Sequence, residues 1–169
     1  MAVTPTGIFS LPLARVRTLL CASTTWQEWV DADANDATGA AGHVRFYEIG
    51  KDEAASLRPW ALIGHNDQWG WVKIAEVSHA PDWSVILWFE AVIPEAYQAA
   101  DKIGDAVMWF TNKVGAVLEE MLALCGTSGY PNALTIRLFQ GPERPEEKLR
   151  TSEGDYFAVA FEVTGGIRS

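Results

Sequence analysis

The stretch "DKIGDAVMWFTNKVGAVLEEMLALCG", residues 101–126, carries a hydrophobic repeat with the spacing of an α-helix. Its apolar residues follow one another in steps of four and three: Ile103, Val107, Phe110, Val114, Val117, Met121 and Leu124. This spacing places them on one helix face. Asp101 is the expected N-cap, and Gly126 the expected stop. Because Leu118 and Leu122 widen the stripe, we expect the helix to cover a sheet rather than to form a coiled coil.

Alternation of apolar and polar residues predicts strands on both sides of this helix. The expected strands are residues 44–49, 59–64, 69–77, 84–93, 133–139 and 156–164. Segment 84–93 is apolar on both faces. Such a pattern is typical of a central strand, or of a strand whose outer face meets a partner.

Two more helices are expected before the first strand. Ser10, with Leu11-Pro12 after it, predicts a helix from residue 10 to about residue 22. Thr25 and Glu28 have the spacing of a capping box, which predicts a second, short helix. The order of elements predicts an α+β fold. We expect a mostly antiparallel sheet of five to six strands, with the long helix and the N-terminal helix packed on one face.

The length of 169 residues is that of one domain, so we expect a single domain over residues 1–169. Within it we expect a flexible N-terminus at 1–9, an acidic loop at 31–42 and a charged arm at 140–155 between the last two strands. The arm is too polar to bury much apolar surface. It is therefore predicted to be a mobile hairpin tip, or an extension that orders against another subunit.

Composition limits the class of partner. The formal net charge of −9, with scattered Lys and Arg, argues against a nucleic-acid-binding face. No stretch approaches the roughly 20 apolar residues of a membrane span. The N-terminus lacks the pattern of a secretory signal, so we expect cytosolic synthesis without export. Cys21 and Cys125 have no metal-binding spacing and are expected to be buried free thiols in a reducing compartment.

The run Asp31-Ala-Asp33-Ala-Asn35-Asp36 resembles the first half of a calcium-binding loop. An EF-hand loop needs glycine at its sixth position, for a sharp turn, and a bidentate glutamate at its twelfth. This chain has Asp36 and Gly42 at those positions. We therefore expect no metal here, only a solvated connection in front of a strand.

Catalytic patterns are also missing from the sequence. His43, His65 and His79 lie in or beside predicted turns, without a nucleophile elbow near them. Glu119 and Glu120 are adjacent on the long helix, where neighbours diverge by about 100°, so they are expected on its solvent face rather than as an acid–base pair. No phosphate-binding glycine motif is present. We expect no catalytic residue and no cofactor.

Several of the eight tryptophans lie on or beside predicted strands. One modest core needs fewer, and large rings on both faces of strands favour a subunit interface. The charged arm is a second candidate contact, because its side chains can bridge neighbouring subunits. The residues predicted at the interface are Trp69, Trp71, Trp88, Arg144, Glu146 and Arg150.

The layout of residues 10–166 resembles that of tail terminator and tail-completion proteins of long-tailed phages and prophages. The resemblance rests mainly on "WFTNKVGAVLEEM" at 109–121 and "YFAVAFEVTGG" at 156–166. The helix pair "LARVRTLLCASTTWQEWV" at 13–30 and the strand "SVILWFEAVIP" at 84–94 extend it. The acidic segment 31–42 and the density of tryptophan have no counterpart in the family.

The resemblance implies a virion structural protein of the tail or neck, assembled in the cytoplasm of the bacterial host. Its subunits would close into a homo-oligomeric ring, expected to hold six copies, which caps the tail tube and joins it to the head connector. An acidic lumen would let DNA pass without specific binding. Alternatives are another neck or head–tail adaptor protein, a subunit of a non-phage tail-like apparatus, and a small-molecule-binding α+β domain with His65 or His79 at the rim of its pocket.

Overall fold

The computed structural model describes residues 4–5, 10–46, 57–65, 82–127, 130, 134–138, 150–151 and 154–166. The helices are α1 (Ser10–Ala22), α2 (Thr24–Trp29), α3 (Ala37–Ala41) and α5 (Ile103–Leu124), with 3-10 turns η1 (Glu95–Tyr97) and η2 (Ala100–Lys102). The strands are β1 (Val44–Phe46), β2 (Trp60–His65), β3 (Asp82–Val92), β4 (Leu134–Leu138), β5 (Arg150–Thr151) and β6 (Gly154–Gly166).

The described strands form one mixed sheet in the order β1-β2-β3-β6-β4, and β5 pairs with β6. β1 runs parallel to β2, and the other pairs are antiparallel. The predicted α+β class and mostly antiparallel sheet are confirmed. β3 lies at the centre of the order, which confirms the prediction of a central strand. The strand predicted at 69–77 lies outside the described residues.

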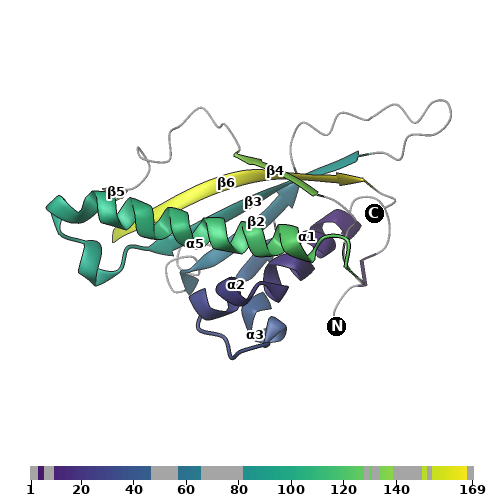
Figure 1. Cartoon of the computed structure of the whole chain (residues 1–169), viewed down its shortest axis with the longest axis horizontal. Coiled ribbons are helices and arrows are strands. Elements are labelled where there is room, and N and C mark those ends of the chain that lie inside the picture. The colour runs from purple at the N-terminus through teal and green to yellow at the C-terminus, as the bar shows by residue number, and fades with distance from the viewer. Residues whose placement is uncertain are drawn as a thin grey trace.

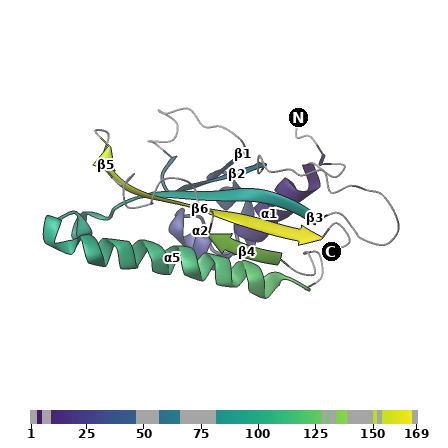
Figure 2. The ribbon, with the colours of Figure 1, turned by 90° about the horizontal axis from the view of Figure 1, so that it is seen from above.

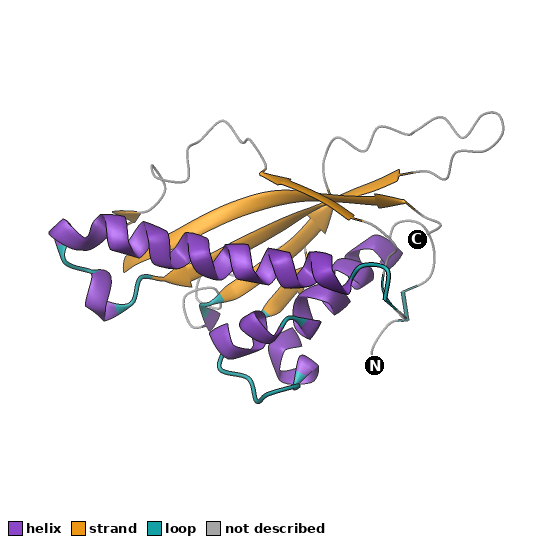
Figure 3. Cartoon of the chain, in the orientation of Figure 1, coloured by secondary structure: helices purple, strands orange, loops and turns teal. Residues whose placement is uncertain are grey.

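Helix α5 lies along the sheet on the same side as α1 and α2 (Figures 1 and 3). The helical repeat of the sequence accounts for its buried side, which is formed by Ala106, Phe110, Val114, Val117 and Met121. The predicted cap is wrong, because Asp101 lies in η2 and no side chain caps the helix at Lys102. Gly126 adopts a φ of 79°, a left-handed conformation that suits glycine and ends the helix as predicted.

The N-terminal helix α1 has the predicted bounds and buries Val16, Leu19 and Leu20 completely. The predicted capping box of α2 is wrong. Its N-cap is Ser23, whose hydroxyl accepts the N–H of Trp26 at 3.1 Å. Thr25 instead turns its hydroxyl to α5. The hydroxyl of Thr25 therefore bonds to Glu120, which is distant in sequence, instead of capping its own helix.

The predicted acidic loop at 31–42 is partly helical. Residues 37–41 form α3, and the carboxylate of Asp36 caps it by accepting the N–H groups of Thr38 and Gly39. The prediction of an irregular loop is therefore wrong for 37–41. Two positions before α3, Asp31 and Asn35, have positive φ values of 58° and 65°. Asp and Asn tolerate this conformation better than most residues, which fits the turn chemistry of the sequence.

One hydrophobic core lies between the helices and the sheet. Aromatic rings fill its middle: Trp29 meets Trp26 edge-on, with ring centroids 5.9 Å apart, and stacks on Phe89 of β3 at 6.3 Å. Trp26, Trp60 and Trp83 are all buried. Part of the tryptophan excess that we assigned to an interface is therefore used in packing the chain itself.

Candidate binding groove beside an open strand edge

The two halves of β6 have different neighbours. β3 pairs with β6 from Tyr156 to Gly166. On the other side, β4 pairs only with residues 161–165, and β5 pairs with residues 154–155. Within the part of the chain that the structure describes, Tyr156 to Ala160 thus have a strand on one side only. We call this stretch the open edge. Its backbone N–H and C=O groups on that side can bond to an added strand.

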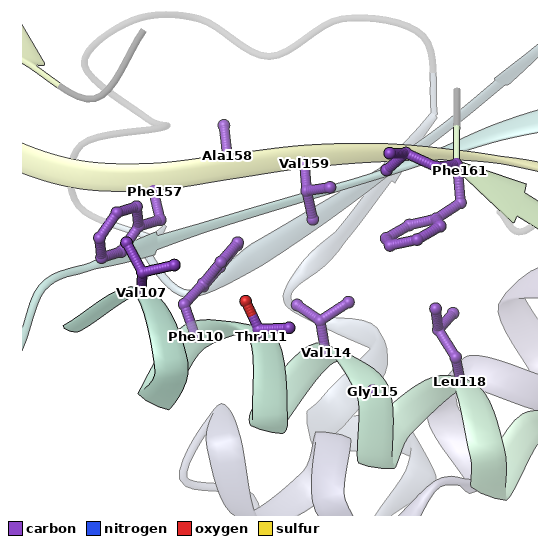
Figure 4. Close-up of a pocket in the computed structure, with 11 residues that line it drawn as sticks. Val107, Phe110, Thr111, Val114, Gly115, Leu118, Phe157, Ala158, Val159 and Phe161 are labelled. Atoms are coloured by element: carbon purple, nitrogen blue, oxygen red, sulfur yellow. The ribbon is translucent and has the colours of Figure 1, made fainter. Parts of the chain in front are cut away.

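A groove lies between α5 and the open half of β6. Seen from above, α5 runs alongside β4 and β6 (Figure 2). The groove has a volume of about 450 Å³. It is lined by Val107, Phe110, Thr111, Val114, Gly115 and Leu118 of α5, Leu138 of β4, and Phe157, Ala158, Val159 and Phe161 of β6. In Figure 4, Phe157, Val159 and Phe161 point from β6 toward the helix. We call this space the α5–β6 groove.

The sequence explains why this space stays open. Gly115 has no side chain, and a Cβ built there would meet no other atom within 4 Å. Phe110 stacks on Phe157 at 5.3 Å between ring centroids, and so fills one part of the space between helix and strand. At the mouth, Val107 is 37% exposed and Leu138 is 52% exposed. Thr111 supplies the one polar side chain among the lining residues. The groove can therefore bury apolar groups beside a row of backbone hydrogen-bonding groups.

The opposite face of the sheet carries two ion pairs among the described residues. Arg58 and Glu90 approach to 2.5 Å, both side chains are 9% exposed, and the guanidinium of Arg58 lies 4.1 Å from the ring centre of Tyr156. Glu162 accepts hydrogen bonds from Ser84, at 2.7 Å, and from Arg137. Arg58, just before β2, is thus joined to β3 through Glu90, and Glu162 of β6 joins β3 on one side to β4 on the other. Their positions between strands indicate a structural role in holding the sheet.

The predicted interface residues are only partly within the described ranges. Trp69, Trp71, Arg144 and Glu146 lie outside the described residues, and of Arg150 only its place in β5 is described. Trp88 lies on the outer sheet face, half-buried, where its register partners are Leu62 of β2 and Ala160 of β6. A role for Trp88 in subunit contact stays a prediction.

Glu120 is not a solvent-facing residue, which corrects the prediction. Its carboxylate accepts the hydroxyls of Ser23 and Thr25 at 2.7 and 2.6 Å, and the N–H of Thr25 at 3.0 Å. Burial opposes ionisation, but these hydrogen bonds together outweigh it and lower the pKa of Glu120. Glu119 is exposed, as expected. The carboxylate is fully used in tying α5 to the start of α2.

Other polar groups are also engaged in the structure. The Nδ1 atom of His43 lies 3.0 Å from the carbonyl oxygen of Leu57 and 2.8 Å from that of Pro59. Cys21 and Cys125 are free thiols. Cys21 is buried as predicted, and burial raises its pKa to about 11, against the smaller opposing effect of Arg17. Cys125 is only half-buried, and partial burial raises its pKa as well.

In the described ranges, no three or more His, Cys, Asp or Glu side chains gather as metal ligands would, and this includes the acidic run at 31–36. None of the helices in the described part of the chain is long and apolar enough to cross a membrane. No family model matches the sequence, and no curated protein matches it either.

Sequence reasoning did not find the α5–β6 groove. It placed Val107 and Phe110 on the buried stripe and placed Phe157, Val159 and Phe161 on the inward face of the strand at 156–164. One signal was present: Gly115 lies within a strong helical repeat, where glycine destabilises a helix relative to alanine. A glycine at such a position often marks a site where another group approaches closely.

Proposed function

We propose that this protein is a non-enzymatic virion structural protein of the tail-terminator type. Its subunits assemble into a ring of six, which caps the tail tube and joins it to the head connector. The proposal rests on the resemblance in sequence layout and on one structural observation, the α5–β6 groove beside the open edge. The tail tube protein and the head connector are the partners that this role implies.

The groove supports an assembly role through its chemistry. Its lining is apolar except for the hydroxyl of Thr111, and no charged side chain that could transfer a proton is among the described residues that line it. An apolar groove supplies buried area, while the strand edge supplies directional hydrogen bonds that fix the register of a partner. Both are requirements of a specific protein contact.

Charge is consistent with a role around DNA rather than on it. A net charge of −9 per chain becomes a large negative charge when copies gather in a ring. Such a ring repels the phosphate backbone, so that DNA passes through its lumen without being retained. The proposed place of the protein is the tail or neck of the virion, after assembly in the host cytoplasm.

Solution mass is the first test. Multi-angle light scattering on a size-exclusion column, over a concentration series at low and moderate salt, should show a closed particle of six chains. Val107→Gln should weaken association, because it places an amide at the groove mouth. Leu122→Gln is the matched control, since Leu122 is on the same helix, is 43% exposed and lies outside the groove. A monomer at every concentration, with no rings in negative-stain images, would contradict the proposal.

The groove volume favours one alternative function. About 450 Å³ lies within the range of small-molecule pockets, roughly 300–1,000 Å³. A small-molecule-binding domain would stay monomeric and would gain thermal stability from an apolar ligand such as a fatty acid. Another neck or head–tail adaptor protein would form a ring as well, and immunogold labelling of intact virions would place it.

A further inference from the structure

We infer that the α5–β6 groove takes the N-terminal segment of a second copy of this chain, residues 1–9, as an added strand along the open edge of β6. This inference rests on the proposed function, because it supposes that copies of the chain associate. It names the contact through which they do so.

The shape of the site selects an extended occupant. The open edge from Tyr156 to Ala160 presents backbone groups at strand spacing, and the groove below receives side chains from one face of whatever lies along that edge. An added strand satisfies both, because its backbone bonds to the edge while every second side chain points into the groove. A helix in the groove would leave the backbone groups of the edge unpaired.

The segment "MAVTPTGIF", residues 1–9, fits both demands. It contains no charged side chain, and the described residues of the groove lining contain none either. Met1, Val3 and Pro5 alternate with Thr4 and Thr6, so an extended conformation places apolar groups on one face and hydroxyls on the other. Thr4 and Pro5 are exposed on their own chain, and so are accessible to a neighbour.

The segment 139–149, which contains most of the charged side chains of the predicted arm, is a poorer occupant, although it connects β4 to β5 in the chain. It leaves β4 at Leu138, which is paired with Phe161, and returns at Arg150, which is paired with Asp155. Its residues include Glu143, Arg144, Glu146, Glu147 and Lys148. Burying such charges against apolar side chains without partners is unfavourable.

Pro5 gives the added strand a defined register and an end. It has no N–H, so it suits a position whose backbone faces away from β6. The N–H groups of Thr4 and Thr6 then face the open edge. The new outer edge lacks a donor at Pro5, which discourages a further strand from adding. Five strand residues span about 17 Å and nine extended residues reach about 30 Å, so the segment is long enough.

The arrangement of the chain favours a second copy as the donor. α1 begins near the end of the sheet where β6 ends, whereas the open edge lies toward the end where β6 begins (Figures 1 and 2). A strand given by one copy to the next therefore uses two different surfaces of each chain. Such a head-to-tail contact closes into a ring when its rotation allows.

The test uses two pairs of full-length variants with light scattering as the readout. Val3→Asp puts a charge on the face of the donor strand that enters the groove, and Thr4→Asp puts the same charge on its outer face. Gly115→Leu fills the acceptor groove, and Gly104→Leu adds the same side chain on α5 outside it. A Cβ added at either glycine would meet no atom within 4 Å. We expect Val3→Asp and Gly115→Leu to raise the dissociation constant at least about tenfold, and the two controls to leave it nearly unchanged.

A mixing experiment shows that the two affected variants still fold. Val3→Asp keeps an intact groove, and Gly115→Leu keeps an intact donor strand. Mixed together, they should form a one-to-one heterodimer that does not grow further. The heterodimer together with association of the wild-type chain would place the segment in the groove of a second copy, because a chain that filled its own groove would stay monomeric.

The possible failures can be separated. If the wild-type chain is monomeric at every concentration, the proposed function and this inference fail together. If it associates but Val3→Asp behaves like Thr4→Asp, only the inference fails. If Gly115→Leu loses association while Val3→Asp and both controls keep it, the contact would be a pairing of the open edges of two copies, without the N-terminal segment. Absence of the heterodimer, with normal association of the wild type, would also overturn the inference.

Discussion

Helix α5 has two apolar flanks that meet different surroundings. On one flank, Val117 and Met121 are fully buried against the core, and Glu120 is tied to the start of α2. On the other flank, Val107 is 37% exposed and lines the α5–β6 groove. The residues on the two flanks are similar in type. What differs is the described element opposite: α1 and α2 lie against one flank, whereas on the other side the described part of β4 pairs only with residues 161–165 of β6.

The comparison shows that a hydrophobic stripe does not by itself decide what is core. A helix face is buried only where the rest of the chain supplies a surface to cover it. The wide stripe of α5 therefore serves two purposes, with one part packing the domain and the other remaining open to a partner. The following substitutions test this difference between the flanks.

The largest effect is expected in the packed flank. Met121→Ala removes a fully buried side chain, and should lower the free energy of unfolding by about 2–5 kcal/mol because a cavity remains. Leu122→Ala, one residue further on, removes a side chain that is 43% exposed and should cost less than about 1 kcal/mol. Urea unfolding followed by circular dichroism measures both. Equal losses would mean that Met121 is packed no more firmly than the exposed Leu122, and would contradict the assignment of Met121 to the packed flank.

A smaller effect is expected from the hydrogen bonds that join Glu120 of α5 to Ser23 and Thr25, which we call the polar tether. Glu120→Gln removes the charge that accepts the hydroxyls of Ser23 and Thr25, and should destabilise the protein by about 1–2 kcal/mol. Glu119→Gln is the matched control, because Glu119 is exposed on the same helix. The same urea unfolding applies. A loss in Glu120→Gln no greater than in its control would show that the tether contributes nothing to stability.

The tether should also make stability depend on pH. The pKa of Glu120 lies below its ordinary value of 4.5 in the folded state, so its contribution is present above that value and is lost as the pH falls through the folded pKa. The difference in stability between wild type and Glu120→Gln should therefore be full at neutral pH and shrink as the pH falls below 4.5 and through the folded pKa. A difference that is constant over this range would contradict the role of the charge.

The elements with long regular patterns could be predicted from the sequence. The repeat of α5 and the alternation of 84–93 each continue over several turns or residue pairs, so the existence and approximate bounds of α5 and β3 followed. The burial of α5 followed only in part, because Ile103 and Val107 of the predicted stripe are 41% and 37% exposed. Contacts between distant segments could not be predicted. Ser23 and Glu120 are 97 residues apart, and no local spacing indicates that they meet. The cap of α2 and the position of Glu120 were wrong for this reason.

The groove depends on how far β4 extends along β6, and a sequence pattern does not record where a neighbouring strand stops. Val159 and Phe161 alternate as core residues do, yet both are only partly buried and line the groove. Trp88 was placed correctly on a strand face by alternation alone. The ion pairs on that same face, such as Arg58 with Glu90, again join residues that lie far apart in sequence.

The smallest effect is expected at Gly115, and it tests whether the open flank is truly open. Gly115→Ala should raise the free energy of unfolding by about 0.5–1 kcal/mol, because alanine favours the helix and the added methyl group meets no atom within 4 Å. Gly104→Ala adds the same group in the first turn of α5, where the gain should be smaller because helix ends depend less on propensity. Thermal and urea unfolding of both variants give the comparison. A loss of stability in Gly115→Ala would mean that β6 lies closer to the helix than the structure places it, and that the second flank is packed after all.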